Sequence, residues 1–182
     1  MEKEKQIVVR KNSYWLSEIG YIFFKYQIGY EVYDYSKESK QVSDGIDLFV
    51  LNKQDIPTYI MCIGNDYPYD KIFFPISTDE QESRLFKSKA DFVFIYDVKQ
   101  ESVTLLEIEL LTQRINLHFD KYKQAVKGNS VGIQIPKDDE ILKPFINEYK
   151  LNQNVSDKAK RIYDYRIKNK KLTESKFLPL FR

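Results

Sequence analysis

The stretch ADFVFIYDVKQESVTLLEIELL, residues 90–111, carries most of the fold prediction. Residues 90–97 are rich in β-branched and aromatic side chains, and residues 103–111 contain three β-branched residues among leucines; both compositions suit strands. The intervening residues 98–102 are mostly polar and have a length typical of a hairpin connection. The stretch therefore predicts two paired strands, with Asp91 across from the segment Glu107 to Glu109.

Helix and strand patterns alternate on both sides of this hairpin. From Tyr14 to Tyr26, apolar residues recur at helical spacing, and Gly29 follows as a stop. Short β-rich runs come next, separated by turn residues. The predicted strands are Tyr30–Tyr35, Ile46–Asn52, Thr58–Gly64 and Ser130–Ile135; a looser segment is expected around Tyr67–Pro75; and the other predicted helices are Asp79–Ser88, one marked by Ile115 to Val126 and ending at Gly128, Asp139–Tyr149 and Ser156–Asn169.

Together these elements predict an α/β protein with a mixed central β-sheet flanked by helices and a basic helical C-terminus. A chain of 182 residues is long enough for one hydrophobic core, so we expect one domain over residues 1–182. Residues 150–182 are expected to form a basic helical extension packed on that domain.

Composition excludes several classes of protein. No run approaches the roughly 20 apolar residues of a membrane helix, and no apolar signal segment follows the charged start, so we expect a cytoplasmic protein without a membrane partner. One cysteine and one histidine cannot form an internal disulfide, a cysteine-rich zinc site or a multi-histidine cluster. A metal would therefore be held by carboxylates. Glycine-rich phosphate-binding motifs are absent from the sequence, which disfavours a nucleotide cofactor.

Charge is unevenly distributed along the chain. The net charge is +2, yet residues 150–182 contain 10 Lys and Arg against 3 Asp and Glu. Such a segment, which also contains Tyr163, Tyr165 and Phe177, can track a nucleic-acid backbone. A solvated amphipathic helix gives the same pattern, so both interpretations remain open.

Acidic residues near the hairpin are the candidates for chemistry. Because residues i and i+2 of a strand face the same side, Glu107 and Glu109 are expected to point together, and Asp91 on the neighbouring strand can join them. Three converging carboxylates suit Mg²⁺ or Mn²⁺, which would polarise a phosphodiester and activate a water molecule. Lys121 or Lys123 on the following helix would add positive charge. Solvated acids on an exposed strand face are the competing interpretation.

Three segments carry a family resemblance: Lys89–Phe92, Leu106–Glu109 and His118–Lys123. Together they resemble the PD-(D/E)XK nuclease superfamily, whose core pattern is an aspartate on one strand, an acid-x-lysine on the next, then a helix and another strand. The resemblance covers about a quarter of the chain and implies a restriction-endonuclease-like sheet.

In this first register, Asp91 and Glu107 would be the metal ligands, and Glu109 would assist the attacking water. Ala90 stands in place of the family's proline, and Glu109 stands in place of its lysine. Some restriction enzymes of the superfamily use a glutamate at the lysine position.

A second register resembles the resolvase-like and intron-homing branches of the same superfamily. Glu18 would be the helix acid, and Asp47 would be the strand aspartate. The acid-x-lysine strand would run over residues 59–64, where Cys62 and Gly64 occupy the two key positions. Under this register the fold can persist while catalysis is lost or moved.

The second register is the longer alignment, because a later strand of such proteins often reads like residues 90–97. The first register keeps the acidic set Asp91, Glu107 and Glu109. We therefore predict a metal-dependent endonuclease that hydrolyses DNA, in restriction, homing or mobile-element defence. The alternatives are a catalytically degenerate module that binds nucleic acid or protein, with homodimerisation presenting two such surfaces, and an interaction protein unrelated to nucleic acids.

Overall fold

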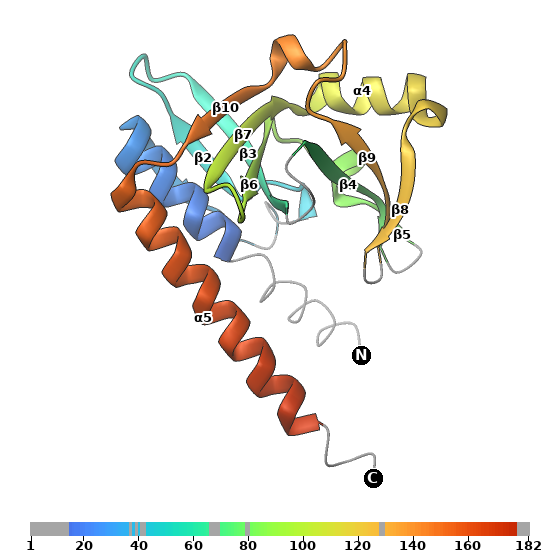
Figure 1. Cartoon of the computed structure of the whole chain (residues 1–182). Helices are drawn as coiled ribbons and strands as arrows, with labels where there is room; N and C mark the ends of the chain where they lie inside the picture. Colours follow the sequence, from blue (N-terminus) through green and yellow to red (C-terminus); the bar gives the residue numbers. More distant parts are fainter. Residues whose placement is uncertain are drawn as a thin grey trace.

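Two β-sheets form the body of the protein (Figure 1). The computed structural model describes residues 15–36, 38, 40, 43–65, 70–78, 81–127 and 130–177. The larger sheet contains, in spatial order, β1 (Glu31–Asp34), β2 (Leu48–Leu51), β3 (Pro57–Asn65), β6 (Phe92–Asp97), β7 (Ser102–Glu107) and β10 (Asn147–Lys150). The smaller sheet contains, in spatial order, β5 (Gln81–Glu82), β4 (Lys71–Thr78), β9 (Ser130–Pro136) and β8 (Lys123–Lys127).

The larger sheet is mixed, as predicted. Strands β3 and β6 run parallel, whereas its other neighbouring pairs are antiparallel. Strands β6 and β7 form the predicted hairpin, in a register that pairs Phe92 with Glu107 and Asp97 with Ser102. The strands predicted at residues 30–35, 46–52, 58–64 and 130–135 are also confirmed.

Helical segments flank the sheets. The first helix ends as predicted at Gly29, whose φ of 80° is left-handed and whose amide donates to the Phe24 carbonyl. Among the described helices, none is both long and apolar enough to cross a bilayer. The segments are the α-helical residues 15–22, the π-helix η1 (Phe23–Ile28), α3 (Arg84–Lys87), α4 (Ile108–His118), the 3₁₀ turns η2 (Phe119–Lys121) and η3 (Lys143–Phe145), and α5 (Gln153–Phe177).

Both faces of the larger sheet are buried, because apolar residues alternate along its central strands. On one face, Phe94 and Tyr96 pack with the first helix and with α5, which lie together beside the sheet (Figure 1). On the other face, Val93 and Ile95 pack with α4 and with the inner side of the smaller sheet. The smaller sheet and α4 therefore form the second layer of the fold.

The prediction for residues 103–128 is partly wrong. The strand ends at Glu107, and α4 begins immediately because Ile108, Leu111 and Ile115 form one buried helical face. The alternation in the segment LEIELL predicts a strand, but the same residues also fit helical spacing. The helix ends at His118, and residues 123–127 form β8 because they pair with β9.

The predicted helix over Asp139–Tyr149 is also wrong. The Asp139 carboxylate accepts hydrogen bonds from the amides of Ile141 and Leu142, which favours a turn. The single 3₁₀ turn η3 follows, and the chain then becomes β10 because it pairs with β7. A tertiary strand partner thus overrides the local helical pattern.

The segment between β3 and β6 is more ordered than the sequence indicates. Strand β4 covers residues 71–75 of the segment expected to be loose, with a β-bulge between Pro75 and Ser77. The predicted helix over Asp79–Ser88 is limited to the four residues of α3. The loop residues Tyr67 and Tyr69 lie outside the described residues.

Candidate functional site

Asp47, the strand aspartate of the second register, lies just before β2 and is 1% exposed. Its amide donates to the Ile60 carbonyl and its carbonyl accepts from the Tyr35 amide, each at 2.8 Å. Its carboxylate is held twice. Oδ1 accepts from Nη2 of Arg84 at 2.7 Å, and Oδ2 accepts from the amide of Cys62 at 2.7 Å.

Helix α3 brings the arginine to this carboxylate. The Ser83 side chain caps the helix by accepting from the amide of Leu85, and Leu85 anchors it in the core. At the other end, Ser88 Oγ donates to the Gly45 carbonyl at 3.0 Å. A Cβ at residue 45 would lie 2.9 Å from Ser88, and the φ of Gly45 is 71°, so the close contact requires glycine.

Burial of Asp47 and its salt bridge to Arg84 have opposite effects on the pKa of the carboxyl. Burial raises the pKa of the Asp47 carboxyl, and the Arg84 guanidinium and the Cys62 amide offset part of that effect. Burial also raises the pKa of the Cys62 thiol well above its ordinary value, so the thiol stays protonated. Because both oxygens of the Asp47 carboxylate already accept hydrogen bonds, the carboxylate has no free oxygen directed at a water molecule or substrate.

The residues around Asp47 do not fit a Mg²⁺ site. Mg²⁺ requires several oxygen ligands in near-octahedral geometry. Both carboxylate oxygens of Asp47 are already engaged, Cys62 and Gly64 supply no carboxylate, and Glu18 is exposed on the first helix. Across the described ranges, no three His, Cys, Asp or Glu side chains gather in a way that could hold a metal ion.

The acids of the first register lie in three different settings. Asp91 precedes β6, and its Oδ2 accepts from the Tyr59 amide at 2.7 Å. Glu107 is exposed at the end of β7. Glu109 lies in the first turn of α4, where its Oε1 accepts from Gln113 at 3.1 Å. The expectation that Glu107 and Glu109 share a strand face is wrong, because the helix begins between them.

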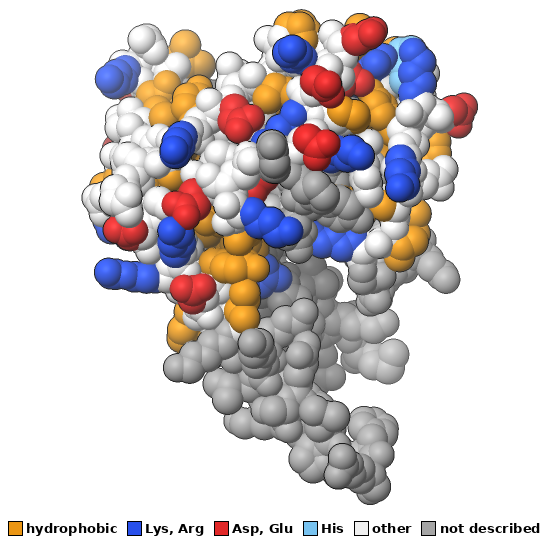
Figure 2. Space-filling view, viewed as in Figure 1, with side chains coloured by type: hydrophobic (Ala, Val, Ile, Leu, Met, Phe, Trp, Pro, Cys, Tyr) orange, Lys and Arg blue, Asp and Glu red, His pale blue; other side chains and the backbone are white. Residues whose placement is uncertain are grey.

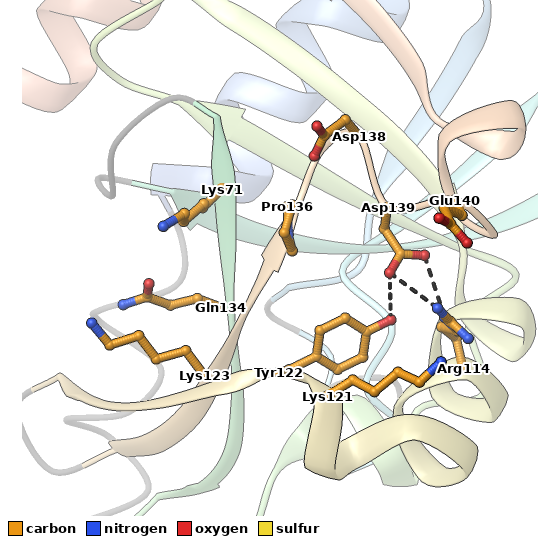
Figure 3. A pocket seen from close by; sticks show the side chains of 10 residues that line it. All are labelled: Lys71, Arg114, Lys121, Tyr122, Lys123, Gln134, Pro136, Asp138, Asp139 and Glu140. Atoms are coloured by element: carbon orange, nitrogen blue, oxygen red, sulfur yellow. Dashed lines mark hydrogen bonds and ion pairs between the residues drawn. The ribbon is translucent and has the colours of Figure 1, made fainter.

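A separate hollow of about 440 Å³ lies between the smaller sheet, η2 and the turn after β9 (Figure 3). Both lysines named in the sequence analysis, Lys121 and Lys123, line it, but Asp91, Glu107 and Glu109 do not. Within the described part of the chain, these lysines and Lys71 form no ion pair. The lining residues are Lys71, Arg114, Lys121, Tyr122, Lys123, Gln134, Pro136, Asp138, Asp139 and Glu140.

One side of the hollow is a hydrogen-bonded network centred on Asp139. Its carboxylate accepts from Arg114 at 3.2 and 3.3 Å and from the Tyr122 hydroxyl at 2.7 Å (Figure 3). Burial alone would raise the pKa of Asp139, but the hydrogen bonds from Tyr122, Arg114 and two backbone amides lower it overall. Burial and the hydrogen bond to Asp139 raise the pKa of Tyr122 to about 12. The network fixes α4 to the turn after β9.

This network predicts acid sensitivity. Because the pKa of Asp139 is lower in the folded state than in the unfolded state, its stabilising effect is complete above the ordinary aspartate pKa of about 4 and is lost as pH falls through the folded-state value. We expect Asp139→Asn to be less stable than wild type at neutral pH and to lose less stability on acidification. Urea unfolding at stepped pH measures both effects. Asp138→Asn, at an exposed neighbouring site, is the control, and parallel pH curves for wild type and Asp139→Asn would contradict the assignment.

Sequence reasoning missed Arg84 and Lys71. The sequence does contain a clue to Arg84. Lysine is the common basic residue of this chain, and between residues 11 and 160 arginine occurs only at positions 84 and 114. Each of them holds a carboxylate, Asp47 and Asp139 respectively. The planar guanidinium suits such contacts better than an ammonium group does. Lys71 could not be found in this way, because its neighbours in the hollow come from distant segments.

Comparison with known proteins adds no relative to this picture. Neither the family models, nor the curated proteins, nor the solved structures give a match.

Proposed function

We propose that this chain is a nucleic-acid-binding module built on a restriction-endonuclease-like sheet in which a salt bridge has replaced the metal centre. The observation that carries the proposal is the double engagement of Asp47 by Arg84 and by the Cys62 amide. It favours the binding module over the metal-dependent endonuclease as the function of the chain.

The order of the elements supports the second register. The first helix, with Glu18, precedes the sheet; Asp47 leads into β2; and β3 carries the positions of Cys62 and Gly64. Strand β3 is the antiparallel neighbour of β2, and β6, which contains most of residues 90–97, is the parallel neighbour of β3. The strands that this register requires are thus adjacent in space.

Arg84 supplies the positive charge that a metal would otherwise provide beside Asp47. A guanidinium neutralises the buried carboxylate, but unlike a metal it coordinates no water whose pKa it could lower. Water activation, the step that drives phosphodiester hydrolysis in metal-dependent nucleases, thus has no agent at this position. We infer that the sheet is retained for its shape rather than for hydrolysis.

The basic C-terminal segment supports binding to nucleic acid. Part of its charge is turned toward the domain: the Lys158 ammonium lies 4.3 Å from the ring centroid of Tyr26, and the Arg166 guanidinium lies 4.4 Å from that of Trp15. Arg161 is exposed, and further lysines follow in the sequence. On the face shown in Figure 2, acidic and basic side chains are interspersed, so binding would depend on local basic sites rather than on a uniformly basic face.

Two assays test the proposal. In the first, supercoiled plasmid is incubated with Mg²⁺ or Mn²⁺ and wild type, Glu107→Ala or Asp47→Ala; we expect no cleavage by any of them. In the second, fluorescence anisotropy follows labelled DNA and RNA across a salt series; we expect affinity to fall steeply with salt, because phosphate contacts release counterions. Cleavage that Glu107→Ala abolishes would establish the endonuclease of the first register. Absence of salt-dependent binding would favour the interaction protein unrelated to nucleic acids.

A further inference from the structure

We propose that the hollow beside the smaller sheet is a phosphodiester-binding site, formed by Lys71, Gln134 and Lys123, that holds the backbone of the bound nucleic acid. This inference rests on the proposed function and adds the place of contact. The site belongs to a different layer from Asp47 and uses none of the acids of either nuclease register, although Lys123 belongs to a segment that carries the resemblance of the first.

Strand register brings these three side chains to one face. Gln134 in β9 is paired with Lys123 in β8 on one side and with Phe73 in β4 on the other, and Lys71 is two residues before Phe73. Residues at alternate positions of a strand share a face, so Lys71 and Phe73 face the same way. The opposite face carries Ile72 and Phe74, which are buried in the core. The polar groups therefore lie on the outer face of the smaller sheet.

The polar ends of Lys71, Gln134 and Lys123 point to one side of the hollow, away from the Asp139 network (Figure 3). Each of them is a hydrogen-bond donor, and the two ammonium groups bring like charges onto β4 and β8, the two strands that flank β9, without a carboxylate partner in the described chain. An anion between them would relieve that repulsion and accept charge-assisted hydrogen bonds.

The acids that line the hollow do not cancel this charge. Asp139 is already neutralised by Arg114 and receives the Tyr122 hydroxyl as well. The remaining charged groups of the lining are three lysines and two acids, so the balance is positive. The two acids, Asp138 and Glu140, come from the turn after β9 rather than from the sheet. A hollow of about 440 Å³ has room for a phosphate group and part of its sugar. Because no base-reading pattern accompanies the lysines, the contact would be independent of sequence.

The test compares wild type with Lys71→Gln/Lys123→Gln, using a fluorescein-labelled DNA duplex and anisotropy across a salt series. We expect the double variant to bind at least about tenfold more weakly at 0.1 M salt, with the slope of log K against log salt reduced by about 2, one unit for each lost contact. The matched control is Lys87→Gln/Lys89→Gln. It removes the same charge from exposed lysines that pair with Glu82 and Asp44 near α3, and it should bind nearly as wild type does.

The possible failures are distinguishable. Equal binding by wild type and Lys71→Gln/Lys123→Gln, with loss in Lys170→Gln/Lys171→Gln, would overturn this site and leave the proposed function standing. Lack of binding by wild type would overturn both. Calorimetry with inorganic phosphate distinguishes a site for free phosphate from a site for the nucleic-acid backbone. If the double variant lost phosphate binding but kept full affinity for the duplex, the backbone assignment would also be overturned. Thermal unfolding of Lys71→Gln/Lys123→Gln should match wild type, since Lys123 is exposed and Lys71 is partly exposed.

Discussion

Arg84→Met is expected to lower the free energy of unfolding by about 3 kcal/mol or more, because it leaves the buried carboxylate of Asp47 without a counter-charge. Urea unfolding followed by the fluorescence of Trp15, the sole tryptophan, measures the change. The deficit should shrink as pH is lowered. Without the guanidinium the pKa of Asp47 rises further, so the folded state takes up a proton that the unfolded state does not bind at the same pH.

Two further variants test whether the loss of stability in Arg84→Met comes from the unpaired buried charge of Asp47 or from a general disturbance of α3. Lys87→Met changes the same helix at an exposed position whose ammonium lies 3.7 Å from Glu82, and should change stability by less than about 0.5 kcal/mol. Asp47→Asn/Arg84→Met removes the uncompensated charge and should recover part of the loss. If Arg84→Met and Lys87→Met were equally stable, the salt bridge would not be the closed pair described here.

Gly132→Ala is expected to destabilise the protein by about 2 to 3 kcal/mol through overpacking. A Cβ at this position would lie 2.3 Å from the Phe74 carbonyl oxygen and 2.6 Å from the Phe73 ring. The ring can move, but the carbonyl belongs to the neighbouring strand and moves only with the backbone. Differential scanning calorimetry should therefore show a lower melting temperature.

Removal of the ring tests which contact dominates. In a Phe73→Ala background, Gly132→Ala should still destabilise the protein by nearly as much as it does in wild type, because the contact with the Phe74 carbonyl remains. Val126→Ala, on the neighbouring strand at a residue 71% exposed, is the control and should change stability by at most about 0.5 kcal/mol. A melting temperature of Gly132→Ala equal to that of wild type would mean that the two strands can separate at little cost.

Local sequence patterns predicted most of the larger sheet. The helix that ends at Gly29, the three strands after it and the β6–β7 hairpin each combine a clear period with a turn or stop signal. The failures lie where two patterns coincide or where a distant partner decides. Residues 108–111 fit both periods, and residues 123–127 and 147–150 become strands because β9 and β7 lie beside them.

The candidate site was predictable only in part. Asp47 was identified because the motif register included it, but its partner lies 37 residues away and follows no motif. Strand alternation places Glu107 and Glu109 of the first register on one face, but Glu109 lies in the first turn of α4. The hollow depends on β4, β8 and β9 meeting, and no local pattern specifies which distant strands pair.

The order in which the chain builds its two sheets also constrains how the protein folds. After β3 the chain leaves the larger sheet to form β4 and β5, returns for β6 and β7, leaves again for β8 and β9, and returns once more for β10. No single break in the chain therefore yields either sheet as an intact fragment. Strand β4 pairs with β9, which is more than 50 residues later in the chain, and such long-range pairing is expected to make formation of the smaller sheet slow. Folding of one sheet is thereby tied to folding of the other, and the pair should unfold in one cooperative transition.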